Sequence, residues 1–158
     1  MERCQGGGVI LRAPLEDELP ALADLCFRSK AVWGYDAAFM EACRPVLRVD
    51  PDRARRGLAR VAVLHDVLLG VAQVSLDGDE AELDLMFVDP DHQGLGAGRR
   101  LFRWAADVAR SHGARRLVIL SDPDARPFYE KMGARFVRLA PSDVIPGREL
   151  PLFELLPT

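Results

Sequence analysis

Residues 88–100 carry the strongest structural signal in the chain: Val88-Asp89-Pro90-Asp91-His92-Gln93-Gly94-Leu95-Gly96-Ala97-Gly98-Arg99-Arg100. An apolar segment ends at Asp-Pro, three glycines follow at alternate positions, and a helical periodicity then begins. The first four N–H groups of a helix have no partner within the helix, and the helix dipole is positive at that end. Glycines let an anion approach those donors without obstruction by a Cβ atom. The stretch therefore predicts a strand, a phosphate-binding loop and the N-terminus of a helix.

The same stretch differs from two common nucleotide-binding loops. No Lys-Ser or Lys-Thr pair follows the glycines, as a P-loop requires. The spacing is not G-x-G-x-x-G, and no acidic residue closes a second strand about 20 residues on, as in a dinucleotide site. Arg99 and Arg100 fall near the first turn, where cations are unfavourable unless an anion neutralises them. An alternative is that the glycines only allow the strand and the helix to pack closely.

Upstream of the glycines, the periodicity of apolar residues changes between that of strands and that of helices. The expected strands cover residues 9–12, 61–64, 67–76 and 82–88, and the expected helices cover residues 15–31 and 36–44. His65-Asp66 and Asp77-Gly78-Asp79 are turn signals that join the last three of these strands into an antiparallel meander.

Downstream, the expected helices run from the glycines to about residue 112 and over residues 125–132, and the expected strands cover residues 117–120, 135–139 and 152–156. The order β-αα-βββ-α-β-α-ββ combines a meander with a βαβ crossover. We therefore predict an α/β fold, with a central mixed, mostly antiparallel sheet and helices on both faces. One domain is expected over residues 9–158, after a flexible lead-in at residues 1–8.

The composition limits the class of protein. A chain of 158 residues with 49% hydrophobic residues is long and apolar enough to fold as one globular domain. A net charge of −3 argues against a nucleic-acid surface, and the short basic run at Arg53, Arg55 and Arg56 is interpreted as a solvated face. No apolar run approaches the roughly 18 residues of a membrane span.

Three cysteines, Cys4, Cys26 and Cys43, share no metal-ligand spacing. An odd number without such spacing predicts neither a disulfide framework nor a metal site, and it is typical of a cytoplasmic protein. Cys26 and Cys43 fall in predicted helices, where cysteine usually serves as a small buried hydrophobe.

Two short motifs carry further information. Gln93-x-x-Gly96-x-Gly98 is similar to the Q/R-x-x-G-x-G/A signature of the GNAT superfamily of N-acetyltransferases, at the place where the superfamily has it, after a strand. About 30 residues later, Asp124-Ala125-Arg126-Pro127-Phe128-Tyr129-Glu130-Lys131-Met132-Gly133-Ala134 resembles its x-A-x-x-F-Y-x-x-x-G-F/A segment. Ser29-Lys30-Ala31-Val32-Trp33-Gly34-Tyr35 also resembles the start of one branch of that superfamily. The resemblance implies a GNAT-like fold and transfer of an acetyl group to a primary amine.

The resemblance implies acetyl-CoA as the cosubstrate and no metal. The residues implied to hold the pyrophosphate through their backbone N–H groups are Gln93, Gly94, Leu95, Gly96, Ala97, Gly98 and Arg99. The strand ending at Val88 is implied to pair with the pantetheine arm, and an N–H near Val88 to polarise the thioester carbonyl next to a strand bulge. Asp124 stands where many members have Asn; a carboxylate cannot donate to the coenzyme as an amide can, although it can cap a helix.

The resemblance implies Tyr129 as the general acid that protonates the leaving thiolate. A tyrosine packed at a helix–sheet contact is the alternative. Glu82 and Asp84 lie two residues apart on one predicted strand, so they are expected to share a face with Met86. They are candidates for the general base or for an anchor of a cationic amine, and a solvated strand end is the alternative.

Trp33 and Tyr35 end the first predicted helix, where the resemblance places part of the acceptor pocket. Such an aromatic pair could hold a cation, or pack in the core. His65 and His92 fall in predicted turns and are weaker candidates for the base. The acceptor is expected to be a small-molecule or peptide amine, and the strand at 152–156 could pair with a second copy in a homodimer.

The expected reaction is direct transfer in a complex of enzyme, acetyl-CoA and amine, because no Cys or Ser has a partnered base in the sequence. Two other classes of function stay open at this point. One is a non-catalytic acyl-CoA-binding or sensor module with the same fold. The other is an unrelated phosphate- or nucleotide-binding domain that uses the same helix N-terminus.

Overall fold

The computed structural model describes residues 8–157, so Cys4 and all but the last residue of the lead-in predicted at residues 1–8 lie outside the described part. The strands are β1 (Ile10–Arg12), β2 (Ala59–Leu64), β3 (Val67–Asp77), β4 (Glu80–Val88), β5 (Arg116–Leu120), β6 (Arg135–Pro141) and β7 (Glu149–Leu155). The helices are α1 (Leu19–Ala31), α2 (Ala37–Cys43), α3 (Pro51–Arg55), α4 (Ala97–Ser111) and α5 (Arg126–Lys131). Short 3-10 turns precede or follow them: η2 (Glu16–Glu18), η3 (Arg44–Val46), η4 (Pro90–His92) and η5 (Pro123–Ala125).

The predicted order of elements is confirmed, with α3 as an addition. The sequence contains a signal for this short helix, because the Asp50 side chain accepts a hydrogen bond from the Asp52 N–H and Pro51 occupies the first turn. The predicted helix over residues 15–31 is instead the turn η2 followed by α1.

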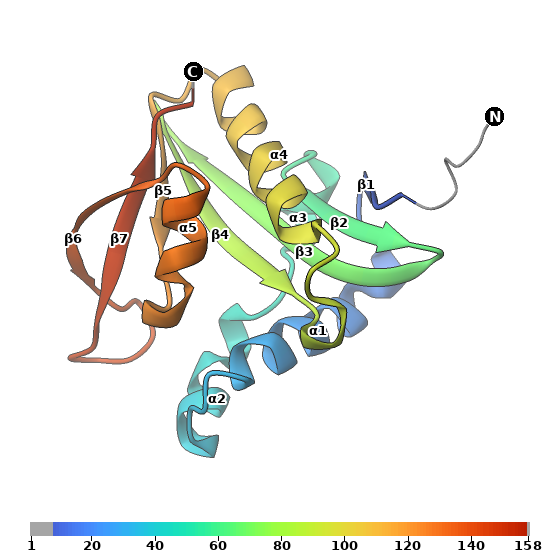
Figure 1. Ribbon diagram of the computed structural model, residues 1–158, viewed down its shortest axis with the longest axis horizontal. Coiled ribbons are helices and arrows are strands. Elements are labelled where there is room, and N and C mark those ends of the chain that lie inside the picture. Colours follow the sequence, from blue (N-terminus) through green and yellow to red (C-terminus); the bar gives the residue numbers. More distant parts are fainter. Residues whose placement is uncertain (1–7, 158) are drawn as a thin grey trace.

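The strands form one seven-stranded sheet in the order β1-β2-β3-β4-β5-β7-β6 (Figure 1). β4 and β5 pair in parallel and all other neighbours are antiparallel, which confirms the predicted mixed, mostly antiparallel sheet. β7 lies between β5 and β6, so its backbone is paired on both sides. The suggestion that residues 152–156 pair with a second copy is therefore wrong, since only an edge strand has free backbone groups.

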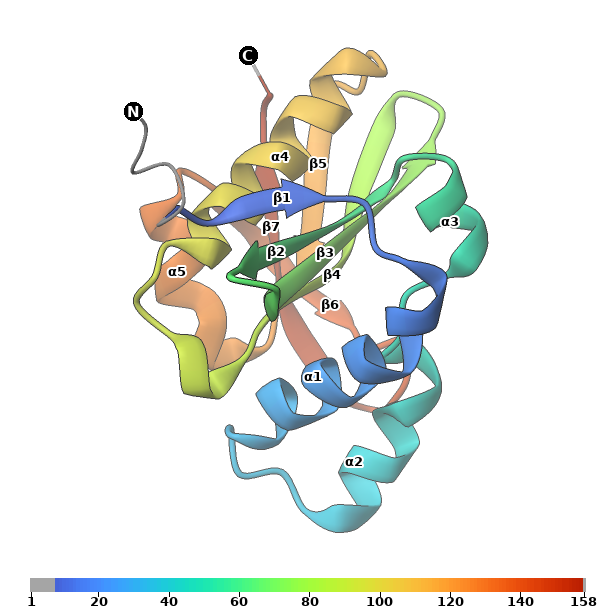
Figure 2. The same cartoon turned by 90° about the vertical axis from the view of Figure 1, so that its right-hand side faces the viewer.

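Helices cover both faces of the sheet (Figure 2). Each face has its own hydrophobic core. On one face α4 contributes Leu101, Phe102 and Ala105 to a cluster with Val74, and on the other α1 packs against β3 and β4. These cores fix the angle between α4 and the sheet, and hence the place where α4 begins.

Two large hydrophobic side chains near the cleft and the sheet edge are exposed. Leu95 precedes α4, with 45% of its surface accessible, because the helix begins only at Ala97. Phe136 lies on the edge strand β6 and is 37% exposed, with Arg126 stacked 4.7 Å from its ring. None of the helices within residues 8–157 is long and apolar enough to cross a membrane.

Candidate active site

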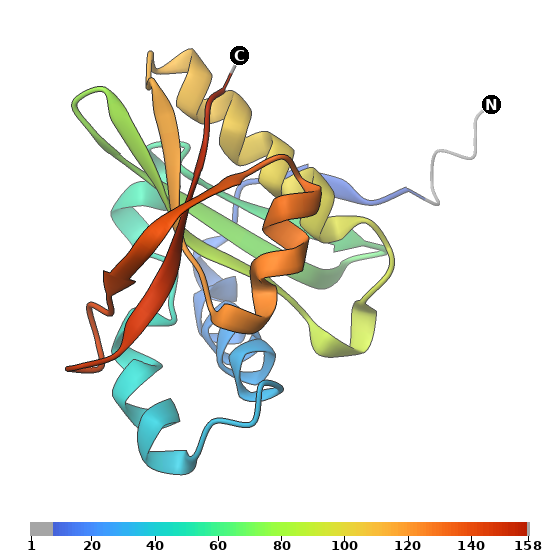
Figure 3. The same ribbon diagram turned by 60° about the vertical axis from the view of Figure 1, so that its left-hand side comes forward.

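β4 and β5 separate halfway along their length. They pair only from Glu80 with Arg116 to Glu82 with Val118, and beyond this point residues 83–88 have no neighbour on that side within the described chain. Figures 1 and 3 show the two strands diverging, with α5 following β5. A cleft of about 1020 Å3 occupies the space between them, lined by Met86 and Val88 on one side and by Leu120 and Ser121 on the other.

The open edge of β4 presents backbone donors to this cleft. The Asp89 N–H donates to the Leu69 carbonyl of β3 at 2.7 Å. Backbone groups of successive residues in a strand point to opposite sides, so the N–H groups of Val88 and Met86 point away from β3, toward the cleft. The predicted donor near Val88 thus has a suitable direction, and Met86 offers a second one.

β4 does contain a bulge, but it is not adjacent to Val88. Gln73 pairs with Leu85 and Val74 pairs with Leu83, so Asp84 is the extra residue. The bulge reverses the alternation of side chains: Leu83 joins the core under α4, whereas Leu85 joins the core under α1. Met86 consequently packs on the α4 face, and the expectation that it shares a face with Glu82 and Asp84 is wrong.

The loop before α4 forms the cradle that the sequence predicted. Gly94 and Gly96 have φ angles of 81° and 84°, a left-handed conformation that glycine adopts without the steric cost of a side chain. Gly96 is the N-cap of α4 and no side chain caps the helix, so its first N–H groups stay free for a ligand. The residues predicted to hold the pyrophosphate all line the cleft: Gln93, Gly94, Leu95, Gly96, Ala97, Gly98 and Arg99.

Close packing does not by itself require the third glycine, Gly98. A Cβ atom on Gly98 would lie 3.4 Å from the Phe128 ring and 3.5 Å from Val88 Cγ2. These are ordinary van der Waals distances, so a side chain at Gly98 would fill cleft space between α4, α5 and β4. Gly70 of β3 does have to be glycine, because a Cβ atom there would lie 2.8 Å from the Phe87 carbonyl oxygen.

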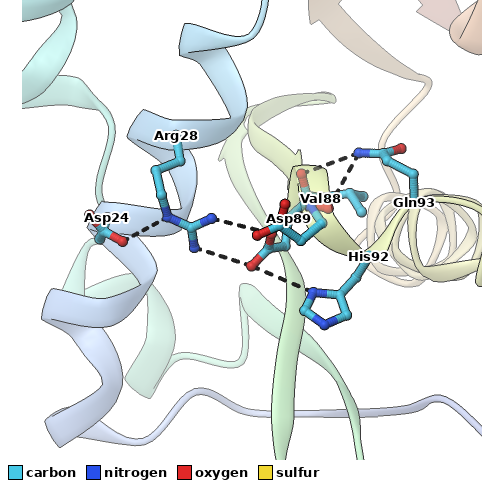
Figure 4. Close-up of polar contacts among 7 residues, drawn as sticks. Asp24, Arg28, Val88, Asp89, His92 and Gln93 are labelled. Atoms are coloured by element: carbon cyan, nitrogen blue, oxygen red, sulfur yellow. Dashed lines mark hydrogen bonds and ion pairs between the residues drawn. The ribbon is translucent and has the colours of Figure 1, made fainter.

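Arg28 of α1 anchors the segment between β4 and the cradle (Figure 4). Its guanidinium donates to both carboxylate oxygens of Asp89, at 3.2 and 3.1 Å, and to Asp24 at 2.9 Å. This pairing lowers the pKa of the Asp89 carboxyl. His92 Nδ1 is buried without a hydrogen-bond partner among the described residues and lies 3.7 Å from Asp89 Oδ2.

Tyr129 is buried and lines the cleft, between Phe128 and Phe153. Burial, and to a lesser degree the charge of Asp122, raises the pKa of its hydroxyl well above the ordinary value, so the group is protonated at neutral pH. Asp124 is exposed at the rim of the cleft, within η5. The N-cap of α5 is Ala125, so the suggestion that Asp124 caps this helix is wrong.

Glu82 and Asp84 lie on the same side of the sheet, on the wall of a second cavity of about 530 Å3. Asp84 accepts hydrogen bonds from Ser75 at 2.9 Å, Arg53 at 3.2 Å and Gln73 at 3.3 Å, whereas Glu82 is exposed and has no such partner among the described residues. Desolvation and then the negative charge of Asp84 raise the pKa of Glu82, and desolvation also raises that of Asp84.

Trp33 and Tyr35 do not form an aromatic pair around one ligand. Trp33 is 42% exposed and lines the cleft beside β4, whereas Tyr35 stacks on Phe39 with ring centroids 4.1 Å apart. The Tyr35 hydroxyl donates to Asp122 at 2.9 Å and accepts from Arg148 at 2.7 Å. Protein cations already flank the Tyr35 ring, so the idea that it holds a cationic acceptor is not supported.

Sequence reasoning missed several polar residues near these cavities. Lys30 donates to Asp122 at 2.7 Å, and both side chains are largely buried. Arg53, interpreted as part of a solvated face, instead pairs with Asp84. Arg148 comes from the loop between β6 and β7. The segment at residues 29–35 contained the signal for Lys30, but nothing local marked Asp122 or Arg148 as its neighbours.

Cys26, Cys43 and His65 do not line the cleft. Cys26 is buried in α1, and burial raises the pKa of its thiol to about 12. Cys43 is buried at the wall of the second cavity, where desolvation also raises its pKa. Both thiols are therefore protonated and poor nucleophiles at neutral pH, as expected of small buried hydrophobes. His65 is exposed in the β2–β3 turn, away from the lining of both cavities.

Comparison with known families matches the region that contains the cleft. Residues 33–134, which include β4, the cradle, α4 and Tyr129, match the acetyltransferase (GNAT) family. This chain belongs to the GNAT family. The resemblance that the two motifs suggested is therefore confirmed, and so is the prediction of an acetyltransferase at the level of the family.

Several GNAT relatives share the fold at low sequence identity. The PaiA N-acetyltransferase from Thermoplasma acidophilum, solved in complex with coenzyme A, is 15% identical with a TM-score of 0.74, over 94% of this chain and 99% of that one. N-acetylglutamate synthase from Neisseria gonorrhoeae, solved with coenzyme A and N-acetyl-glutamate, is 22% identical with a TM-score of 0.66, over 95% of this chain and 35% of that one. These structures confirm the predicted GNAT-like α/β fold.

One curated relative is similar over a shorter stretch. Glucosamine 6-phosphate N-acetyltransferase from Trypanosoma brucei brucei is 38% identical over 48 residues, which is 30% of this chain. The chain covers about a third, 33%, of that relative's length. The match supports membership in the family and does not define the acceptor.

Proposed function

We propose that this GNAT protein is an acetyl-CoA-dependent N-acetyltransferase that transfers the acetyl group directly to a primary amine. The observation that carries the proposal is that the two cavities are adjacent and share part of their walls. Leu83, Asp84 and Phe87 of β4 line both the cleft beside the cradle and the second cavity, as do Leu120 and Asp122 at the end of β5. A donor held in the cleft and an amine in the second cavity would meet between the diverging strands.

The residues present suit coenzyme A. The uncapped N-terminus of α4 and the left-handed Gly94 and Gly96 offer a phosphate-binding cradle. The open edge of β4 offers backbone groups to which the amides of a pantetheine arm could pair, as an added strand does. Arg99, exposed at the rim, supplies positive charge for the phosphates. Asp124 cannot donate a hydrogen bond when ionised, so the cradle and β4 would account for binding.

Acetyl-CoA supplies an acetyl thioester, and this chain's own groups would orient it and move the protons. The N–H of Val88, or that of Met86 two residues earlier, donates to the thioester carbonyl oxygen. This hydrogen bond stabilises the negative charge that develops on the oxygen. Tyr129 holds its proton at neutral pH and gives it to the departing sulfur. No covalent intermediate is required, since the buried thiols of Cys26 and Cys43 are protonated.

Glu82 is the better candidate for the general base. Its carboxylate accepts no side-chain hydrogen bond within residues 8–157, whereas that of Asp84 accepts hydrogen bonds from three side chains. Asp84 would hold the substrate ammonium at the bulge of β4, and Glu82 would accept its proton. The raised pKa of Glu82 brings this group closer to the operating pH, where a base is most effective.

The test is a calorimetric titration of the protein with acetyl-CoA, repeated on Gly96→Glu. Glutamate at this position adds a negative charge to the cradle and a side chain to a left-handed residue. We expect micromolar binding to the wild type and its loss in the variant, with the fold of the variant verified by circular dichroism. Failure of the wild type to bind would overturn the proposal.

Binding without turnover would favour the other function of the same fold. If the wild type binds acetyl-CoA but releases no coenzyme A with a broad panel of amines, the chain is a non-catalytic acyl-CoA-binding module. A peptide panel and a small-molecule panel, assayed separately, would divide the two acceptor classes. A cytoplasmic location, the absence of a metal and the flexible lead-in remain predictions from the sequence.

A further inference from the structure

We infer that the acceptor is a small primary amine that also carries an anionic group, such as a phosphate or a carboxylate. This inference deepens the proposed function and rests on it. The second cavity, of about 530 Å3, is a suitable size for a small molecule. Its charged residues are distributed unequally between its two sides.

The side formed by β4 is negative. Glu82 and Asp84 line it, and Asp143 of the β6–β7 loop is close enough to raise the pKa of Glu82 further. Arg53 is the cation that faces these groups, at 3.2 Å from Asp84. Asp50, also on the cavity wall, lies 3.8 Å from Arg53. Four carboxylates with one guanidinium leave an excess of negative charge where an ammonium group would approach the thioester.

The side formed by α1 and the β6–β7 loop is positive. Lys30 Nζ lies 5.3 Å from the centroid of the Tyr35 ring, and the Arg148 guanidinium lies 4.9 Å from it. Both cations therefore pack against the same aromatic ring. Asp122 is the carboxylate between them: it pairs with Lys30 at 2.7 Å and accepts a hydrogen bond from Tyr35. Two cations around one carboxylate leave an excess of positive charge.

Arg148 has donors to spare for a ligand. One of its terminal nitrogens donates to the Tyr35 hydroxyl at 2.7 Å, and it forms no ion pair within residues 8–157. A half-buried guanidinium fixed through one nitrogen presents its remaining N–H groups in the fork geometry that matches a carboxylate or a phosphate. Arg48, also on the cavity wall, is exposed and likewise unpaired among the described residues.

The two sides together recognise a molecule with opposite charges at its ends. An amine that lacks the anion would leave Arg148 unpaired on binding. We therefore expect kcat/KM to be about 10- to 100-fold higher for an anionic amine than for its neutral counterpart, the range of one charge-assisted hydrogen-bonded contact.

The experiment uses matched pairs of amines on the full chain with saturating acetyl-CoA. O-Phosphoethanolamine is paired with ethanolamine, and 4-aminobutanoate with 4-aminobutanamide, which separates phosphate from carboxylate. Coenzyme A release is measured with wild type, Arg148→Gln, Arg148→Lys and the control Arg115→Gln, whose exposed side chain lies outside both cavities. Calorimetry with the same amines on the coenzyme A complex gives affinities independently of turnover.

We expect Arg148→Gln to raise KM for the preferred anionic amine about 10- to 100-fold, with partial recovery in Arg148→Lys and no change in Arg115→Gln. Equal use of the anionic and neutral members of each pair would overturn the inference, and so would an equal loss for both members in Arg148→Gln. Binding of neither anionic amine to the coenzyme complex would also overturn it. Normal acetyl-CoA binding and acetylation of neutral amines in any of these cases would leave the proposed function standing.

Discussion

At the scale of single residues, the environment of Tyr129 gives it one protonation state. The ring packs against Phe128 and Phe153, and burial keeps the hydroxyl protonated at neutral pH. A group in this state can donate a proton to a leaving thiolate, and it cannot serve as a base.

Tyr129→Phe removes this proton donor and keeps the ring. We expect kcat to fall roughly 10²- to 10⁴-fold, with little change in the affinity for acetyl-CoA. Steady-state kinetics and calorimetry on the same preparation measure the two quantities. Unchanged turnover would remove Tyr129 from the mechanism, and Phe128→Leu controls for altered packing of α5.

Glu82 and Asp84 are coupled through their charges, which gives a prediction for pH dependence. The negative charge of Asp84 contributes to the raised pKa of Glu82. A base acts in its deprotonated form, so kcat/KM should rise with pH through the Glu82 pKa and level off above it. Asp84→Asn removes the like charge and should lower the Glu82 pKa, so the rising part of the kcat/KM–pH profile should move to lower pH.

Glu82→Gln provides the contrast. It should lower kcat/KM at neutral pH by roughly 10²-fold or more and abolish the rising part of the profile. The profiles are measured with one acceptor at fixed acetyl-CoA, so that the titration of the amine is common to all three proteins. If the profile of Glu82→Gln still rises with pH over the same range, the titration belongs to another group.

At the scale of elements, α1 holds the segment that carries the cradle. Asp89 follows β4 directly and is buried, and Arg28 reaches it across the gap between α1 and the loop (Figure 4). The contact joins two elements that are 61 residues apart in the sequence. It restrains the loop on the side opposite to α4.

Arg28→Gln leaves the Asp89 carboxylate buried with its main partner gone. We expect a loss of about 1–3 kcal/mol in the free energy of unfolding and a severalfold weaker affinity for acetyl-CoA. Asp24→Asn is the matched control: it removes the exposed partner of the same guanidinium and should change stability by less than about 0.5 kcal/mol. Urea denaturation measures the stability of the two variants, and calorimetry measures their affinity for acetyl-CoA. Equal effects in both would mean that the Arg28–Asp89 pair does not stabilise the loop.

At the scale of the whole molecule, the sheet is divided between two cores. One lies under α4 and α5 and the other under α1 and α2, and β4 contributes residues to both. The cleft lies where β4 and β5 part, so a ligand there contacts elements from both halves of the sheet.

Acetyl-CoA should therefore stabilise the whole fold as well as the loop. At a concentration 100 times the Kd, binding to the native state contributes about 2.7 kcal/mol, which raises Tm by about 5–10 °C in a domain of this size. Differential scanning fluorimetry measures the shift. Gly96→Glu should show none, and a shift of equal size in that variant would move the binding site away from the cradle.

The sequence by itself determined the order of the elements, the glycine cradle and the family. These features depend on local rules: the period of apolar residues, the conformational freedom of Gly94 and Gly96, and the free N–H groups of a helix terminus. They can be read from segments of about ten residues, and α3, which is only Pro51–Arg55, was too short to stand out. The GNAT motifs lie within the same segments.

Only the tertiary structure decided the face of each β4 side chain, the open edge and the polar partners in the second cavity. The bulge at Asp84 depends on how β4 meets β3, and it placed Met86 on the other face from the one predicted. The contact between Lys30 and Asp122 joins residues 92 positions apart. Such contacts depend on the packing of distant elements, which no local periodicity encodes, and they give the second cavity its separated charges.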